Sequence, residues 1–100
     1  MPGVRFSNAA DADLVNIIDY SIEAFGIATA EAYARSFERA FALLVDHPEA
    51  GPFHPDIDPP IRSLSHRSHR IFYEICEGGV RIQRILHKTM DASKHLAGRA

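Results

Sequence analysis

The side chains of this sequence that could do chemistry are six histidines, one cysteine and a set of arginines in the second half of the chain. The histidines lie at positions 47, 54, 66, 69, 87 and 95. Their spacing is not that of a metal site on a helix and they have no cysteine partners, so we expect neither zinc nor another cofactor. Cys76 lies in an apolar run, where a cysteine is usually a small core residue rather than a nucleophile.

Charge is distributed unevenly along the chain. Residues 1–58 carry ten acidic and three basic side chains, a net charge of −7, whereas residues 59–100 carry three acidic and eight basic ones, a net charge of +5. Such asymmetry predicts a basic surface on the C-terminal half that faces an acidic partner or nucleic acid. The alternative is that acidic helices neutralise a basic sheet within one molecule, and the charges alone leave both interpretations open.

The length of 100 residues fits one domain with a modest core, so we expect a single domain over residues 1–100. No stretch approaches the roughly 20 apolar residues that cross a membrane. The N-terminal sequence also lacks the charged start and apolar run of a secretory signal. With one cysteine and no internal disulfide, the chain is expected to be cytoplasmic and not associated with a membrane.

The first half of the chain has the pattern of a short strand followed by a helix. Val4 and Phe6 alternate with Arg5, which predicts the strand. Ser7 or Asn8 is expected to cap the helix. The apolar face of this helix has helical spacing and consists of Leu14, Ile17, Ile18, Ser21 and Phe25.

A second helix is predicted directly after the first. Gly26 should end the first helix, and Thr29 could cap the second. The second helix has the strongest periodicity in the chain, carried by Ala30, Tyr33, Ala34, Phe37, Ala40, Phe41 and Leu44. His47-Pro48 should end it, and the short link predicts an antiparallel helical hairpin. Residues 48–60 hold five of the six prolines and are expected to be a surface loop that is neither strand nor helix.

The C-terminal half changes to a period of two residues. This predicts strands over 61–65, 69–76 and 80–87, with a hairpin turn at 77–79. Asp91 could then cap a short last helix that carries Leu96. The expected fold is α+β in the order β-α-α-β-β-β, with the helical hairpin packed on one face of a small, mainly antiparallel sheet.

Alternation assigns the side chains of the last two strands to opposite faces of this sheet. The inward set is Ile71, Tyr73, Ile75, Val80, Ile82 and Leu86. The outward set includes Arg70, Glu74, Arg81, Gln83, Ile85 and His87, with Arg62 nearby on an unsettled face. A face that is not covered by helices and carries arginines is expected to be a docking surface. A merely solvated sheet face would show the same pattern.

Arg84 does not fit this alternation, because it would point inward among apolar neighbours. A buried arginine requires a carboxylate, which Asp13 or Asp19 of the first helix could provide. The alternative is a β-bulge that turns Arg84 towards solvent.

The ordered set of residues resembles the ParE branch of the RelE/ParE toxin family, over about Val4 to Leu96. In the first half the resemblance rests on Asp13-Leu14, Ile17, Tyr20, Phe25-Gly26, Tyr33, Pro48 and Gly51. In the second half it rests on Arg62, His69-Arg70-Ile71-Phe72-Tyr73, Val80-Arg81-Ile82, Arg84-Ile85-Leu86-His87 and Met90-Asp91. No single one of these motifs is specific, but their order is.

The resemblance implies the toxin of a type II toxin–antitoxin system. Its expected target is DNA gyrase, and its expected partner is a ParD-like antitoxin, through which it would meet nucleic acid only indirectly. It is then a protein-binding inhibitor rather than an enzyme, without catalytic residues. The surface expected to bind the antitoxin or the target carries Arg62, Arg70, Glu74, Arg81, Gln83 and His87.

Two alternatives accompany this interpretation: a non-toxic binding protein that keeps the fold, and a ribosome-dependent mRNA endoribonuclease of the RelE type. A nuclease would use His87, Arg81 and Arg62 to move protons and stabilise the phosphorane. However, Lys88-Thr89-Met90 follows His87 without a tyrosine, and residues 48–60 contain no Lys or Arg to bind phosphates. His87 could therefore be a packed residue that is hydrogen-bonded near the tail, a contact to a protein target, or a general base.

Overall fold

The computed structural model describes residues 2–96, so both ends of the expected domain, residue 1 and residues 97–100, lie outside it. The helices are α1 (Asn8–Phe25), α2 (Ile27–Asp46) and α3 (Ala92–Leu96). The strands are β1 (Val4–Phe6), β2 (Phe53–His54), β3 (Ile61–His66), β4 (His69–Cys76) and β5 (Gly79–His87). They form one sheet in the order β1-β5-β4-β3-β2, in which β1 is parallel to β5 and the other pairs are antiparallel. The predicted α+β class and the order of its main elements are confirmed.

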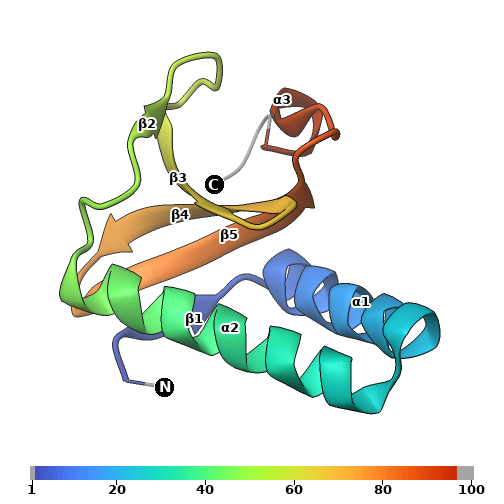
Figure 1. The fold of residues 1–100 in the computed structure, drawn as a ribbon. Helices are drawn as coiled ribbons and strands as arrows, with labels where there is room; N and C mark the ends of the chain where they lie inside the picture. Colours follow the sequence, from blue (N-terminus) through green and yellow to red (C-terminus); the bar gives the residue numbers. More distant parts are fainter. Residues whose placement is uncertain (1, 97–100) are drawn as a thin grey trace.

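The two long helices form a hairpin that lies against one face of the sheet (Figure 1), which we call the hairpin face. Ser7 caps α1 by accepting a hydrogen bond from the amide of Ala10 at 3.0 Å. The predicted cap at Thr29 is wrong, because α2 already begins at Ile27. Gly26, at a φ of 89°, is the whole connection between the helices, and such a φ suits glycine.

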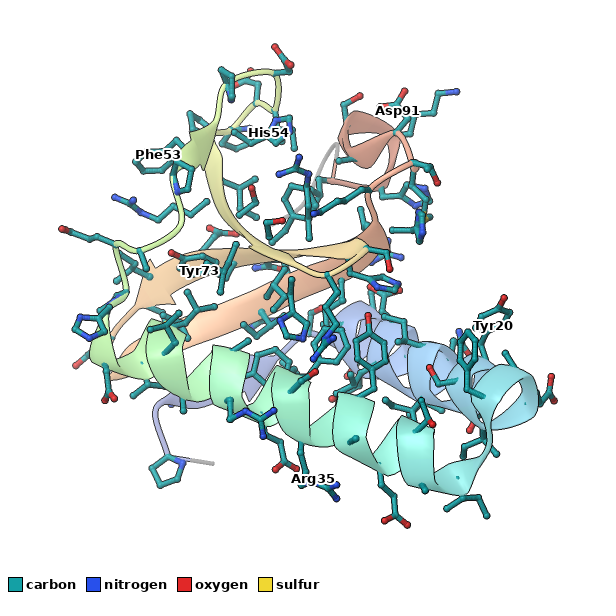
Figure 2. The ribbon with its side chains drawn as sticks, in the orientation of Figure 1. Tyr20, Arg35, Phe53, His54, Tyr73 and Asp91 are labelled. Atoms are coloured by element: carbon teal, nitrogen blue, oxygen red, sulfur yellow. The ribbon has the colours of Figure 1, made fainter. Side chains whose placement is uncertain are left out.

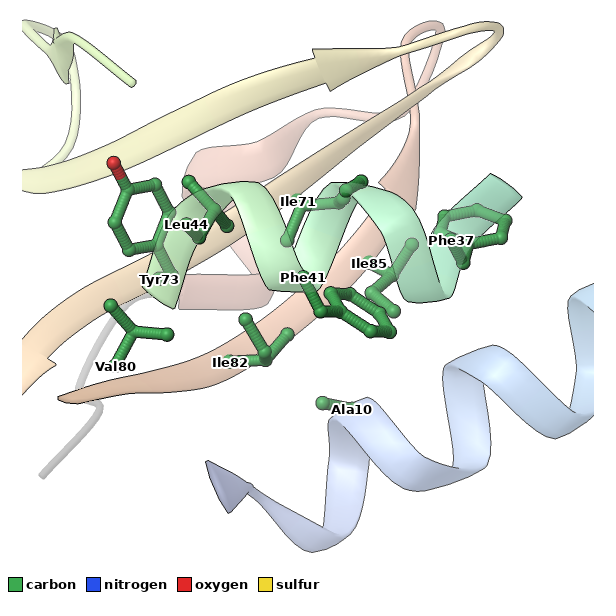
Figure 3. Packing of buried hydrophobic residues seen from close by; sticks show 10 residues of the cluster. Ala10, Phe37, Phe41, Leu44, Ile71, Tyr73, Val80, Ile82 and Ile85 are labelled. Carbon is green, nitrogen blue, oxygen red and sulfur yellow. The ribbon is translucent and has the colours of Figure 1, made fainter. Parts of the chain in front are cut away.

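The main core lies between α2 and the three central strands (Figure 3). Phe37, Phe41 and Leu44 are buried on α2, as their periodicity predicts. Phe6 of β1 meets Phe41 edge to face, with 5.1 Å between ring centroids. Tyr73 points from β4 into the same core. This packing fixes where the hairpin sits on the sheet.

The predicted alternation fails in β5 because the strand contains one extra residue. The register with β4 steps from Tyr73 opposite Ile82 to Phe72 opposite Arg84, so Gln83 is the residue inserted between them. A one-residue shift exchanges the faces of everything after it. Ile85, expected to face outward, is therefore in the main core, whereas Leu86, expected to face inward, lies on the opposite face.

The opposite face of the sheet is not uncovered, contrary to the prediction. A second cluster of buried residues covers part of it and consists of Ile57, Ile61, Phe72, Leu86 and Leu96. Ile57 comes from the loop that was expected to be irregular throughout, and Leu96 from α3, which Asp91 precedes as predicted. Asp91 accepts hydrogen bonds from the Ser93 amide at 3.2 Å and from the Ser93 hydroxyl at 2.7 Å.

The loop over residues 48–60 also contains the short strand β2, which corrects the prediction that no strand lies there. β2 pairs with the start of β3, Phe53 opposite Arg62 and His54 opposite Ile61. Tyr73 of β4 binds the start of this loop through two hydrogen bonds. Its hydroxyl donates to the Pro48 carbonyl at 2.6 Å and accepts from the Gly51 amide at 2.9 Å. Prolines on both sides of β2 are compatible with an edge strand.

Three residues predicted to be buried lie at the margins of the fold. Phe25 is 66% exposed, because it is the last residue of α1, at the end of the hairpin that extends past the sheet (Figure 1). Ile75 is 48% exposed and Cys76 is half-buried, because both lie next to the β4–β5 turn and outside the two clusters. The helical and strand periods do not reveal where a neighbouring element ends.

Candidate protein-binding surfaces

Arg62 is held by the loop that it faces and does not belong to the predicted docking face. Its register partner Tyr73 places it on the hairpin face. Its guanidinium donates to the Gly51 carbonyl at 2.9 Å and lies 4.2 Å from the ring centre of Phe53. Figure 2 shows Phe53 and Tyr73 on either side of this region. The contacts tie β3 to the loop before it.

Arg81 and Glu74 lie on the opposite face, as predicted, and are opposite each other on neighbouring strands. Arg5 of β1 pairs with Arg81 on its other side, and both arginines are exposed. Arg5 was not among the residues predicted for docking, although its alternation with Val4 and Phe6 was a signal for it. We call Arg5, Arg81 and Glu74 the arginine row. Its guanidiniums can pair with carboxylates of another molecule.

Arg70 lies further along the same face, at a separate hollow of about 310 Å³ beside the second cluster. Its register partner is Leu86, and His54, Lys88 and Asp91 line the same hollow. Figure 2 shows His54 and Asp91 on its two sides. Gln83 is the inserted residue of β5, and its carbonyl accepts a hydrogen bond from the Ser7 hydroxyl at 2.7 Å. The predicted docking residues are thus spread over several sites.

His87 does not face outward with Arg81, because the insertion at Gln83 brings it to the hairpin side. It pairs with His69, and their ring centroids are 5.3 Å apart at nearly a right angle. Its Nδ1 atom lies 2.8 Å from the hydroxyl oxygen of Thr89. The predicted hydrogen bond near the tail is present, but the predicted packing is wrong, because His87 is exposed.

The three residues that a nuclease was expected to use are not brought together. Arg81 and His87 are six residues apart on one strand, which is about 20 Å at roughly 3.3 Å per residue. Arg62 lies on the hairpin face at the far side of β4. Proton transfer to or from a reacting group requires hydrogen-bond contact, so these three side chains cannot act on one phosphate together.

A groove of about 720 Å³, which was not predicted from the sequence, lies between the helical hairpin and the β3–β4 turn. Its apolar wall consists of Ile17, Tyr20, Phe25 and Tyr33. Tyr20, 67% exposed, projects from α1 near the hairpin connection (Figure 2). Its polar side is formed by Arg39, Arg67, His69 and His87. Phe25 and Tyr33 had been assigned to buried helix faces and Tyr20 to no face, so helical periodicity did not indicate this groove.

Two hydrogen bonds join α2 to β3 and β4, one of them between residues that line the groove. One joins the Tyr33 hydroxyl to Nδ1 of His69 at 2.9 Å, and the other joins the Ser36 hydroxyl to Nε2 of His66 at 2.9 Å. Burial lowers the pKa of His69 below its usual value, and the imidazoles of His87 and His66 lower it further. Burial also lowers the pKa of His66, with Arg67 and Arg39 adding to the shift. Both imidazoles are therefore neutral at neutral pH.

Comparison with known proteins places the chain in a family. Residues 4–92 match the model of the ParE toxin of the type II toxin–antitoxin system, parDE. The chain belongs to this ParE toxin family. It is 34% identical over 98 residues to Toxin ParE1 of Caulobacter vibrioides, covering 96% of this chain and 99% of that protein. It is 35% identical over 91 residues to Toxin ParE1 of Mycobacterium tuberculosis, covering 90% of this chain and 93% of that protein.

A solved structure has the same fold as this ParE-family chain. It is described as the chromosomal ParDE TA system from P. aeruginosa, with a TM-score of 0.73 and 20% sequence identity. The superposition covers 87% of this chain and 96% of that one. The resemblance to ParE toxins is thereby confirmed for the family and for the fold.

Two further features concern the described part of this ParE-family chain. Within residues 2–96, neither α1 nor any other helix is long and apolar enough to cross a membrane. The same residues contain no group of three or more His, Cys, Asp or Glu side chains that could hold a metal ion.

The carboxylate partner of Arg84 is Asp13, one of the two residues predicted for this role. Asp13 accepts hydrogen bonds from Nε of Arg84 at 2.7 Å, from Nη2 at 2.9 Å and from the amide of Ile85 at 2.9 Å. The bond from Asp13 raises the pKa of Arg84 above its usual value. The insertion and the ion pair therefore occur together, where the sequence analysis had treated them as alternatives. In the ParE-family chain, the insertion and the ion pair attach α1 to the part of β5 that does not pair with β1.

Proposed function

We propose that this ParE-family chain is a toxin that inhibits DNA gyrase, and so replication, in the cytoplasm, and that a cognate ParD-like antitoxin neutralises it. The family match over residues 4–92 carries this proposal. The surfaces of the chain suit protein partners, because an exposed arginine row and an aromatic groove lie on opposite sides of one sheet. Contact with nucleic acid would be indirect, through the antitoxin.

The arrangement of basic residues supports inhibition by binding over RNA cleavage. A nuclease needs a general base and phosphate-binding groups around one phosphodiester. Here Arg81 and His87 are at opposite ends of β5, and the loop over residues 48–60 contains no Lys or Arg.

The deciding experiment is a supercoiling assay with purified gyrase, run beside an mRNA-cleavage assay with translating ribosomes. We expect the chain to reduce supercoiling and to leave mRNA intact. His87→Gln keeps the size and hydrogen bonding of the side chain but is not a base near neutral pH, so it should retain most of the inhibition. Cleavage of mRNA by the parent chain would favour the RelE-type alternative if folded His87→Gln also cleaves it more slowly. The expected reduction is roughly 10²–10⁴-fold, the usual contribution of a general base.

The third possibility, a non-toxic binding protein, is tested by expression without an antitoxin. Growth arrest with induction of the DNA-damage response supports the gyrase inhibitor. Normal growth at a verified level of folded protein would favour a chain that binds its partner but has lost its target.

For the antitoxin, the arginine row is the proposed contact, with Arg70 as a second point on the same face. Charge reversal at Arg81 or Arg70 should weaken the complex more at low salt than at high salt, because salt screens the lost attraction. Reversal of the exposed Arg35, which Figure 2 shows on the outer side of α2, is the control. Equal affinity of the Arg81 and Arg35 variants at both ionic strengths would remove the sheet face as the antitoxin site.

A further inference from the structure

The groove beside the hairpin has walls of two kinds. Its apolar wall is aromatic, and its volume of about 720 Å³ lies within the roughly 300–1,000 Å³ that is common for binding sites. Its polar wall contains cationic and neutral groups but no carboxylate from residues 2–96. An apolar wall next to a cationic one complements a segment that carries apolar residues on one side and carboxylates on the other.

The charges around His69 come from every element that packs against it. α2 contributes Arg39 and the Tyr33 hydroxyl, the β3–β4 turn contributes Arg67, β3 contributes His66, and β5 contributes His87. α1 contributes only uncharged side chains to the groove. No acid is among these groups, so none of the residues 2–96 that face His69 in the groove can be the counter-ion of an imidazolium there.

We propose that this groove docks a carboxylate-rich, amphipathic segment of the antitoxin, and that docking takes up a proton at His69. The identity of the partner rests on the proposed toxin function, whereas the chemistry of the segment rests on the groove. Apolar residues of the segment pack on Tyr20, Phe25 and Tyr33, and its carboxylates pair with Arg67 and His69.

His69 is the group that links docking to pH. Its Nδ1 is held by the Tyr33 hydroxyl, so Nε2 is the atom that can donate to a carboxylate of the partner. In the free protein, burial and the neighbouring imidazoles lower the pKa of His69. A bound carboxylate stabilises the imidazolium and raises that pKa, so the bound state holds a proton that the free state lacks. Affinity must then increase as the pH falls, until the free protein is protonated as well.

The test uses the full chain and a synthetic probe. The probe is a helical peptide of about 15 residues, near the shortest length that forms an isolated helix in water, with Leu on one face and Glu on the other. The control peptide has Gln at each Glu position. We expect the Glu peptide to bind up to about tenfold more tightly per pH unit for one proton taken up, between roughly pH 8 and pH 6. The Gln peptide should show no such change.

Two variants locate the effect in the groove. His69→Gln should remove the pH dependence, so that its affinity does not increase between pH 8 and pH 6. Arg67→Gln should weaken the Glu peptide at every pH while keeping the slope, and its exposed position makes it the safer variant for folding. His95→Gln, on the exposed side of α3, is the matched control and should behave as the parent chain. Circular dichroism of each variant verifies the fold.

A pH dependence that survives in folded His69→Gln overturns the proton linkage. Affinity that is unchanged in Arg67→Gln but lost when Arg81 is reversed overturns the groove as the docking site and moves the segment to the arginine row. If the peptide binds as expected but gyrase remains fully active in the presence of the chain, the proposed target is refuted and the docking site is not. Failure of the proposed function and failure of the docking site are therefore distinguishable.

Discussion

Replacing Asp13 by alanine tests how α1 is attached to the sheet. The Asp13 carboxylate accepts three hydrogen bonds, two from Arg84 and one from the backbone of β5. Removing one partner of a fully buried ion pair costs about 3–5 kcal/mol. Here the side chains of Arg84 and Asp13 are 22% and 14% exposed, so water can solvate part of the released guanidinium. We therefore expect Asp13→Ala to lower the free energy of unfolding by about 2–3 kcal/mol.

The measurement is urea unfolding followed by circular dichroism, with Asp19→Ala as the control. Asp19 is an exposed acid on the same helix, so its removal should change the free energy of unfolding by less than about 0.5 kcal/mol. A double-mutant cycle with Arg84→Met isolates the interaction itself, because the second variant removes the charge that Asp13 neutralises. Equal losses in Asp13→Ala and Asp19→Ala, or a coupling energy near zero, would show that this ion pair does not hold α1 on β5.

Three further predictions concern stability. Phe37 is fully buried, so Phe37→Ala should cost about 3–5 kcal/mol in urea unfolding; a loss under about 1 kcal/mol would contradict the phase of α2. Gly79→Ala should be more destabilising than Gly78→Ala, because a Cβ at Gly79 clashes with the backbone of Gly3 whereas one at Gly78 meets open space; comparable melting temperatures would refute this. Because folding lowers the pKa of His66 and His69, the unfolded chain binds more protons near and below about pH 6.5, and stability should fall as the pH decreases through that range. A double Gln variant at these two positions should flatten the pH dependence, and an unaltered profile would exclude them as its source.

The elements of the fold could be predicted because their signals are local. The spacing of Phe37, Phe41 and Leu44 indicates the buried face of α2 without reference to any other element. The cap at Ser7 and the break at Gly26 are likewise set by neighbouring backbone. The exposure of Tyr20 and Phe25 depends instead on how far the sheet extends beneath the hairpin, and the period of a helix carries no information about that length.

The extra residue in β5 could not be located by alternation, although it left a trace in the sequence. Strict alternation put Arg84 inward and Ile85 outward, and both placements are unfavourable. One inserted residue before Arg84 reverses Ile85 into the core and lets Asp13 reach the guanidinium. Two adjacent misfits that a single insertion resolves together are therefore a usable signal for a bulge. The strand β2, with only two residues, leaves no such periodic signal.

The insertion at Gln83 also determines how a partner can engage this chain. Without it, His87 would share a face with Arg81, and the basic residues of β5 would form one continuous surface. With it, the arginine row lies on one side of the sheet, and the groove with His69 and His87 lies on the other. A rigid globular partner can contact only one of these surfaces at a time. A partner that covers both must pass around the edge of the sheet, which favours an extended segment that orders on binding over a preformed domain.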